Sequence, residues 1–221
     1  MEVRINNHGS NSLSTKTFFS DEKGFEVASV IVTGKTKAVL IDAQWTLSNA
    51  HRLVAEIAET GKHLETIYAT HAHPDHYFGL GVIAEAFPSA RITALASVAR
   101  TINRQFFGKL DHWEKVIGPT NVCRKTVNIE SLSQNSIELE GQRIEIIPEV
   151  LGDMKYNSVV WIPSIKTLYG SDVLFTVDGP GLDYAISATP EPATVAILAM
   201  IAPLLFFLLR RPHQLAAVDR R

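Results

Sequence analysis

The order of apolar and polar residues along the chain predicts strands and helices that alternate early and strands alone later. Short β-branched and apolar runs are typical of strands, and the turn from Gly34 to Lys37 between the first two runs indicates a hairpin. Apolar residues at spacings of three and four indicate helices, the first of which has Gly61 as its C-terminal cap. The predicted strands cover residues 25–33, 38–42, 64–70, 91–96, 136–140, 143–147, 158–162 and 166–170, and the predicted helices cover 47–58, 78–87 and 97–117.

This order of elements predicts a layered α/β fold. Helices separate the early strands, whereas Gly141-Gln142 and Pro163-Ser164 suit tight turns between consecutive late strands. Such an arrangement is neither a β-sandwich nor a helical bundle. Residues 1–20 are polar, contain no apolar run of the kind found in a signal peptide, and are expected to precede the folded domain.

The C-terminal part of the chain has a different composition. Residues 193–209 are uncharged and almost all apolar, and two arginines follow directly. Their number is at the lower limit for a helix that crosses a bilayer. Every face of such a helix is apolar, and Pro203 is better tolerated in a membrane than in a soluble helix. We expect a transmembrane helix at 193–209 between a linker at 179–192 and a basic tail at 210–221, with a buried core helix as the alternative.

Composition excludes some classes of function and leaves others open. The chain has 221 residues, a net charge of −2 and 46% hydrophobic residues, as is usual for a soluble domain with a sizeable core. It has no basic stripe, so a nucleic-acid partner is not expected. Cys123 is the only cysteine, which rules out an intrachain disulfide, and a lone cysteine is more often a small buried apolar residue than a nucleophile.

A cluster of metal-ligand residue types directly follows the predicted strand at 64–70. Three histidines and one aspartate occur within six positions, as His71, His73, Asp75 and His76. Histidines this close would repel one another when protonated, and burying them without partners would be costly. A metal ion removes both problems, because it binds neutral imidazole and carboxylate groups together. A turn after a strand can direct the first two histidines to one side and Asp75 and His76 to the other, which favours two metal ions and hydrolytic chemistry.

The segment from Thr70 to His76, THAHPDH, resembles the metal-binding loop of the metallo-β-lactamase superfamily, including its position after a strand. Leu40-Ile41-Asp42 resembles a strand end found earlier in that family, and Tyr169-Gly170-Ser171-Asp172 resembles a later one. The three motifs occur in the family's order within about residues 24–175. The resemblance implies an αββα sandwich, expected at residues 21–178 and shortened at its C-terminal side compared with the family.

The resemblance also implies a role for each matching residue. His71 and His73 would hold one metal ion, Asp75 and His76 would hold a second, and Asp172 would bridge the two. Asp75 would in addition orient the nucleophilic hydroxide or accept its proton, which makes it the expected catalytic residue.

Supporting roles for Asp42 and Asp153 follow from the same resemblance. Asp42 would hold the histidine loop through hydrogen bonds without touching a metal, with an ordinary turn residue as the alternative. The family has a further histidine ligand before the bridging aspartate, and here Asp153 stands at that position, either as a ligand or as a loop aspartate. As a ligand it would replace an imidazole nitrogen with a carboxylate oxygen, which is a harder ligand in the chemical sense, and so favour manganese or iron over zinc. The family's last histidine ligand has no counterpart, because no histidine lies between His112 and His213.

These observations favour a hydrolase that depends on two divalent metal ions, with zinc expected and manganese or iron as alternatives. A metal-bound hydroxide would attack an ester, thioester, lactone or lactam carbonyl of a small-molecule substrate. The missing last ligand leaves a second interpretation open. In that interpretation the chain is a catalytically degenerate metal-binding domain, anchored at a membrane as a binding or surface protein.

The tail has a resemblance of its own. Thr189-Pro190-Glu191-Pro192, the apolar span and the arginine pair resemble the C-terminal sorting signal known as PEP-CTERM, which bacterial exosortases process. All three parts occur in the expected order. The resemblance implies a protein associated with the membrane of a bacterial cell envelope through residues 193–209, and it leaves the side of the membrane open.

Overall fold

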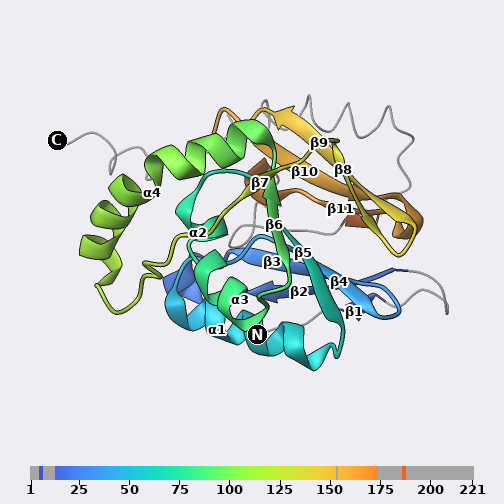
Figure 1. Ribbon diagram of the computed structural model, residues 1–221, viewed down its shortest axis with the longest axis horizontal. Coiled ribbons are helices and arrows are strands. Elements are labelled where there is room, and N and C mark those ends of the chain that lie inside the picture. Colours follow the sequence, from blue (N-terminus) through green and yellow to red (C-terminus); the bar gives the residue numbers. More distant parts are fainter. Residues whose placement is uncertain (1–4, 7–12, 153, 174–185, 188–221) are drawn as a thin grey trace.

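The structure is a computed structural model, and it describes residues 5–6, 13–152, 154–173 and 186–187. These residues form a mixed α/β fold in which two β-sheets lie against each other (Figure 1). The α/β class predicted from the sequence is therefore confirmed. Among the described residues no helix is long and apolar enough to cross a membrane. The span predicted at 193–209 lies outside the described residues.

The first sheet has seven strands, which follow one another in chain order. Strands β1 to β4 pair antiparallel, and β4 to β7 pair parallel. In the parallel part, neighbouring strands end at the same edge of the sheet, so the residues that follow them come close together. The strands are β1 (Ile5–Asn6), β2 (Ser14–Phe19), β3 (Ala28–Thr33), β4 (Lys37–Ile41), β5 (His63–Ala69), β6 (Arg91–Ala94) and β7 (Glu130–Ser131).

The second sheet has five antiparallel strands in the order β12-β11-β10-β9-β8. Side chains from both sheets form one hydrophobic core, in which Ile31 and Leu40 of the first sheet and Val160 and Ile162 of the second are fully buried. Burying each such side chain contributes about 1.5–3 kcal/mol to folding. The strands are β8 (Ser136–Leu139), β9 (Gln142–Val150), β10 (Asn157–Ile162), β11 (Thr167–Tyr169) and β12 (Ile186–Ser187).

Four α-helices accompany the described strands, and α1 and α3 lie along the outer side of the first sheet (Figure 1). The first helix begins where the Thr46 hydroxyl accepts a hydrogen bond from the Asn49 N–H, 3.2 Å away. It buries one face, which includes Leu53 and Ile57, as its apolar spacing predicts. The helices are α1 (Leu47–Glu59), α2 (Pro74–Tyr77), α3 (Leu80–Ala86) and α4 (Ala96–Ile117).

The helix predicted at 78–87 begins earlier and consists of two parts, α2 and α3. Pro74 occupies the first turn of α2, where a proline needs no N–H partner. Gly79 joins the two helices and lies so close to the Ala43 carbonyl oxygen that a Cβ atom there would collide with it. The apolar pattern alone did not show α2, because two of its four residues, Asp75 and His76, are polar.

Strand β2 lies inside residues 1–20, which the sequence pattern assigned to a polar segment before the domain. It pairs with β3 over six residue pairs, so the first sheet begins before residue 21. Thr15 and Thr17 are buried in this strand together with Phe18. Threonine suits a buried strand, because it is β-branched, but in a sequence it is counted as polar. Because these buried threonines were counted as polar, the sequence pattern did not predict the strand.

A single carboxylate connects the two sheets at the end opposite to the histidine loop. Glu140, in the turn between β8 and β9, accepts hydrogen bonds from the N–H groups of Lys35, Thr36 and Lys37 at 2.6, 2.7 and 2.9 Å. The Thr36 hydroxyl donates a fourth at 2.7 Å. This hydroxyl and the N–H groups of the β3–β4 turn lower the pKa of Glu140 to about 2.

We expect Glu140→Gln to destabilise the protein at neutral pH and to lose this effect in acid. Because the pKa of Glu140 is lower in the folded than in the unfolded protein, its contribution is present above about pH 4.5 and disappears as the pH falls toward 2. Urea unfolding of both proteins between pH 7 and pH 3 measures the difference. Glu138→Gln, on an exposed position of the same hairpin, is the control. A difference that does not change with pH would contradict the prediction.

Candidate metal centre

The histidine loop lies at the edge where the parallel strands β4 and β5 end. In the pairing of these strands Ile41 lies beside Tyr68, so Asp42 and Thr70 follow close to each other. The Thr70 N–H donates a hydrogen bond of 2.8 Å to Asp42 Oδ1. Asp172 reaches the same place from the second sheet, in the short turn that follows β11. The two sheets together therefore position the candidate ligands.

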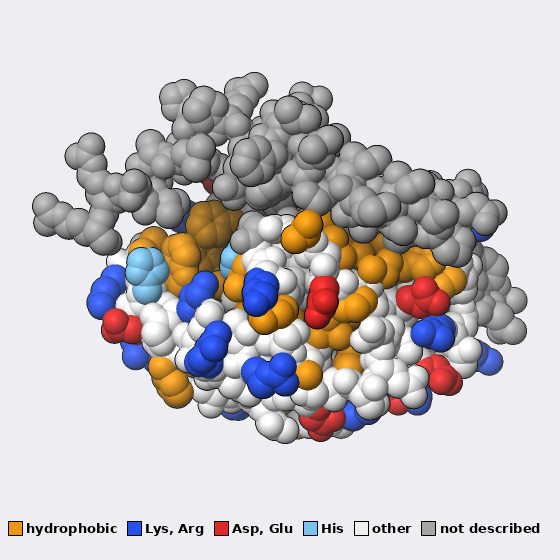
Figure 2. Space-filling model, turned by 90° about the horizontal axis from the view of Figure 1, so that it is seen from above, with side chains coloured by type: hydrophobic (Ala, Val, Ile, Leu, Met, Phe, Trp, Pro, Cys, Tyr) orange, Lys and Arg blue, Asp and Glu red, His pale blue; other side chains and the backbone are white. Residues whose placement is uncertain are grey.

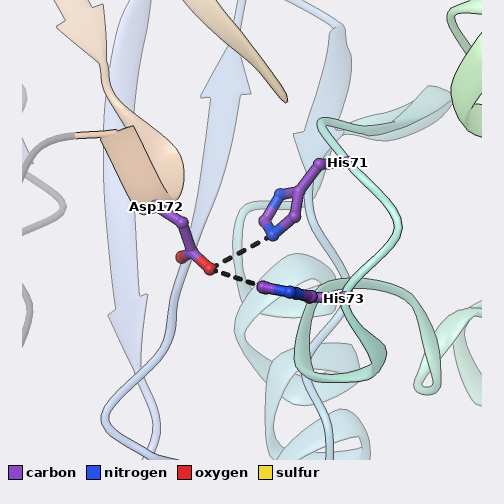
Figure 3. Close-up of side chains that lie close together, drawn as sticks. All are labelled: His71, His73 and Asp172. Atoms are coloured by element: carbon purple, nitrogen blue, oxygen red, sulfur yellow. Dashed lines mark hydrogen bonds and ion pairs between the residues drawn. The ribbon is translucent and has the colours of Figure 1, made fainter. Parts of the chain in front are cut away.

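His71, His73 and Asp172 point toward one another (Figure 3). His71 Nε2 and His73 Nδ1 both lie 3.1 Å from Asp172 Oδ2. His71 is fully buried, whereas 25% of the His73 side chain and 18% of the Asp172 side chain are exposed. The group is thus closed on the protein side and open to solvent on the other. One potential ligand atom from each residue lies within 4.8 Å of the other two, so a single ion can reach all three.

Asp75, His76 and Asp172 form a second group of the same kind. His76 Nε2 lies 3.0 Å from Asp172 Oδ1 and 3.7 Å from Asp75 Oδ2. Asp172 thus turns one carboxylate oxygen to His71 and His73 and the other to His76. The structure therefore brings together His71, His73, Asp75, His76 and Asp172, and it divides them in the same way as the resemblance implied.

The buried ring of His76 has a nitrogen that suits a metal ion. Its Nε2 atom makes no hydrogen bond within the described residues, although Asp172 Oδ1 is 3.0 Å away. A buried polar atom without a partner is costly, and binding a metal ion removes the cost. Imidazole nitrogens with carboxylate oxygens are the ligands that zinc and similar transition ions prefer. The residues present therefore fit a divalent metal.

Asp42 holds the other nitrogen of His76 in place. Its Oδ2 atom lies 2.8 Å from His76 Nδ1 and accepts hydrogen bonds from the hydroxyl groups of Thr70 at 2.8 Å and Tyr169 at 3.0 Å. Because Nδ1 is held by a carboxylate, Nε2 is left to face the second group. Asp42 is 1% exposed and does not belong to either candidate ligand group. This geometry fits the supporting role that the resemblance implied for it.

Four polar residues around the loop were not assigned any role from the sequence. They are buried or nearly so, and each makes a hydrogen bond within the site. Tyr169 donates to Asp42, and the Ser158 hydroxyl donates to the Thr70 carbonyl oxygen at 2.7 Å. Ser171 Oγ lies 2.8 Å from Thr70 Oγ1. Thr70, Tyr169 and Ser171 stand inside the motifs that identified the ligands, which is the only signal the sequence offered for them.

The loop is also held through its backbone. The Ala43 N–H donates to the His76 carbonyl oxygen at 2.8 Å, and the Gly79 N–H donates to the Gln44 carbonyl oxygen at 2.9 Å. This close approach requires a glycine at position 79, as described above. The ligand side chains are thus carried by a backbone that these hydrogen bonds hold in place, and an ordered backbone lowers the cost of arranging ligands around an ion.

Opposite charges dominate the electrostatics of the site. Burial lowers the pKa of His76, but the charges of Asp172, Asp42 and Asp75 outweigh this effect and hold that pKa well above the usual value. Burial raises the pKa of Asp172, but the His76 charge and hydrogen bonds from the other two histidine rings hold it well below the usual value. Three carboxylates around one buried imidazole therefore favour a positive charge at this place.

Two residues singled out in the sequence have different outcomes. Asp153 lies outside the described residues, so its expected role as a ligand stays a prediction. Cys123 is buried in a small apolar cluster with Ala50 and Val82, as expected for a lone cysteine.

Comparisons with known proteins identify the family of the chain. Residues 23–205 match the model of a family described as the metallo-beta-lactamase superfamily. The chain belongs to this superfamily. The match runs past residue 178, where the sequence resemblance placed the end of the domain, and it includes part of the predicted span. No curated protein matches the chain.

Solved structures show the same fold. A metallo-beta-lactamase from Pontibacter korlensis is 18% identical, with a TM-score of 0.59, and the match covers 94% of this chain and 86% of that one. The metallo-beta-lactamase DIM-1, in a crystal exposed to ceftazidime, is 22% identical with a TM-score of 0.58 and coverages of 94% and 85%. The metallo-beta-lactamase IND-7 is 20% identical with a TM-score of 0.58 and coverages of 91% and 85%. At this identity the likeness concerns the fold.

Proposed function

We propose that the protein is a metal-dependent hydrolase with two divalent ions, zinc first and manganese or iron as alternatives. Its substrates would be small molecules with an ester, thioester, lactone or lactam carbonyl. The observation that carries this proposal is the Asp172 carboxylate, in which one oxygen lies 3.1 Å from nitrogens of His71 and His73 and the other lies 3.0 Å from His76 Nε2. Such sharing of a carboxylate is typical of paired-metal sites, and paired metals favour hydrolysis.

In this proposal His71, His73 and Asp172 hold the first ion, and Asp75, His76 and Asp172 hold the second. The ions would polarise the substrate carbonyl and supply a hydroxide at neutral pH. Asp75 has a further task. Its carboxylate is 20% exposed and makes no hydrogen bond to the other described residues, so it is free to orient a water molecule and accept its proton. Asp42 keeps the His76 ring in the orientation that a ligand needs, with Nδ1 toward the carboxylate and Nε2 toward the second group.

Activity measured as a function of metal tests the proposal. The full chain is stripped with a chelator, reloaded with zinc or manganese, and assayed on a panel of esters, thioesters, lactones and lactams. We expect hydrolysis of at least one class that disappears on stripping and returns on reloading. Hydrolysis that persists unchanged without metal would contradict the mechanism. Stoichiometric metal without hydrolysis of any class would favour the degenerate binding domain instead.

Replacing His71 and His73 together with alanine is expected to remove at least one ion per chain. The first group then retains only the shared Asp172, and losing two imidazole ligands lowers metal affinity by far more than the roughly 10–100-fold that a lost supporting residue costs. Metal content by mass spectrometry after dialysis measures the effect. His51→Ala with His63→Ala is a matched control, because both histidines are exposed and neither belongs to the candidate groups. Equal metal content in all three proteins would refute the ligand assignment.

We also propose that residues 193–209 anchor the protein in a bacterial envelope membrane. The full chain should then stay with membranes after washing with alkaline carbonate, and a version ending at Thr189 should be released. Replacing Ile201 with lysine in the full chain provides a second variant, since one charge in the middle of the span costs about 2.5–3.5 kcal/mol. If the full chain and the shortened version are released equally, the segment is not a membrane span.

A further inference from the structure

A cavity of about 390 Å³ lies beside α4 and is lined by polar and cationic side chains. Three of the five lining residues can donate hydrogen bonds, namely the exposed Arg100 and Arg104 and the half-buried Tyr156. The other two are Ser97 and Thr101, whose hydroxyl donates to the Ser97 carbonyl oxygen at 2.8 Å. A volume of this size holds a small molecule or one end of a larger one.

The cavity belongs to the same edge of the fold as the candidate metal centre. Strands β5 and β6 pair so that Ala69 lies beside Ala94, and the histidine loop and α4 begin within two residues of these positions. The other wall comes from the segment before β10. Tyr156 precedes Ser158 by two residues, and Ser158 is hydrogen-bonded to Thr70 in the histidine loop. Both walls are thus continuous with segments that hold the ligands.

Positive charge gathers at this cavity. Arg100 and Arg104 are four residues apart on α4, so their side chains lie on the same face of the helix. Neither forms an ion pair with a carboxylate of the described residues. The Lys155 ammonium lies 5.2 Å from the centre of the Tyr156 ring and adds a third charge nearby. Figure 2 views the molecule from above and shows several Lys and Arg side chains on the left and in the centre of that face, where Asp and Glu are few, and others mixed with Asp and Glu on the right.

We infer that this cavity binds the carboxylate or phosphate group of a substrate whose hydrolysable bond reaches the metal centre. Guanidinium groups bind both kinds of oxyanion through paired hydrogen bonds, and two arginines one helical turn apart can hold one such group from the same side. The Tyr156 hydroxyl supplies a further donor. The inference rests on the proposed function and narrows it, because it makes anionic esters, thioesters, lactones or lactams the preferred substrates over neutral ones.

Anion binding to the zinc-loaded full chain tests the site without requiring activity. Inorganic phosphate and glutarate serve as probes, titrated by calorimetry and by NMR of the arginine Nε–Hε groups. Arg100→Gln with Arg104→Gln is expected to raise the Kd of both probes about tenfold or more, since hydrogen bonds to charged groups are worth about that factor. The zinc content should not change. Arg91→Gln with Arg143→Gln removes the same charge at exposed positions outside the cavity and should leave Kd unchanged.

Kinetics provide a second arm once a hydrolysed substrate is known. A substrate with a free carboxylate or phosphate is compared with its neutral methyl ester. In the wild type, kcat/KM should favour the anionic form, and Arg100→Gln with Arg104→Gln should reduce that preference about tenfold. The neutral form should react at the same rate in both proteins.

The outcomes separate this inference from the proposed function. Loss of probe binding in the cavity variant alone supports the anion site, even if no substrate is hydrolysed. Equal Kd values in the wild type, the cavity variant and the control would overturn it, as would arginine signals that do not shift with either probe. Binding of phosphate without glutarate, or the reverse, identifies which oxyanion the site takes.

Discussion

Asp172→Ala is expected to empty both metal positions and to reduce the rate of hydrolysis by roughly two orders of magnitude or more, because both ions lose a ligand at once. The carboxylate has one oxygen 3.1 Å from His71 and His73 and the other 3.0 Å from His76. No other described residue faces both groups. Metal content and activity are measured together, at several zinc and manganese concentrations.

Asp153→Ala is the comparison for this variant. Asp153 is predicted to serve only the first ion, where His71 and His73 remain and water can take the place of the lost oxygen. Its loss should therefore cost less metal and less activity than the loss of Asp172. Full metal content and activity in Asp172→Ala would show that the two groups of ligands do not share a carboxylate.

Asp42→Asn has the second largest expected effect, and it acts on stability as well as on the site. The carboxylate accepts hydrogen bonds from the Thr70 N–H, the Thr70 hydroxyl and the Tyr169 hydroxyl, and it contacts His76 Nδ1. An asparagine offers one oxygen in place of two, and its amide hydrogens would face these donors. We expect the free energy of unfolding to fall by about 3 kcal/mol and the affinity for the second ion to fall about 10–100-fold.

Tyr169→Phe is the matched control, because it removes a single donor from the same carboxylate. The one hydrogen of the Tyr169 hydroxyl is shared between Asp42 and the Ala28 carbonyl oxygen, which is also 3.0 Å away, so a loss of about 1–2 kcal/mol is expected, with metal affinity close to that of the wild type. Urea unfolding and metal titration on the three proteins measure both quantities. If Asp42→Asn unfolds and binds metal like the wild type, Asp42 is an ordinary turn residue at the end of β4.

Much of the fold could be predicted from the spacing of apolar residues. Helices α1 and α4 and the strands from β3 to β6 lie within a few residues of the predicted ranges, because each has one face or both faces buried. The apolar pattern was less informative where the buried residues are polar or where the backbone turns. Strand β2 buries threonines, and residues 25–27 were included in a strand although Phe25 and Glu26 have positive φ values of 63° and 56°. Such a backbone cannot continue a strand.

The candidate site could be predicted where its residues are chemically unusual. A histidine cluster with an aspartate stands out in any sequence, and the resemblance then pointed to Asp172. Tyr169 and Ser158 did not stand out, because hydroxyl residues occur in strands for many reasons and only the packing of two sheets brings them to the loop. Arg100 and Arg104 were not identified either, since exposed arginines on a helix are common and a cavity has no signature in sequence.

The central claim is that two metal ions share Asp172, and anomalous X-ray diffraction from crystals of the zinc-loaded full chain tests it most directly. Data collected on both sides of the zinc absorption edge locate each ion independently of the protein model. The account predicts two peaks, one bound by His71, His73 and Asp172 and the other by Asp75, His76 and Asp172, each about 2.0–2.2 Å from its ligand atoms. A zinc-loaded crystal with no peak at these residues would contradict it.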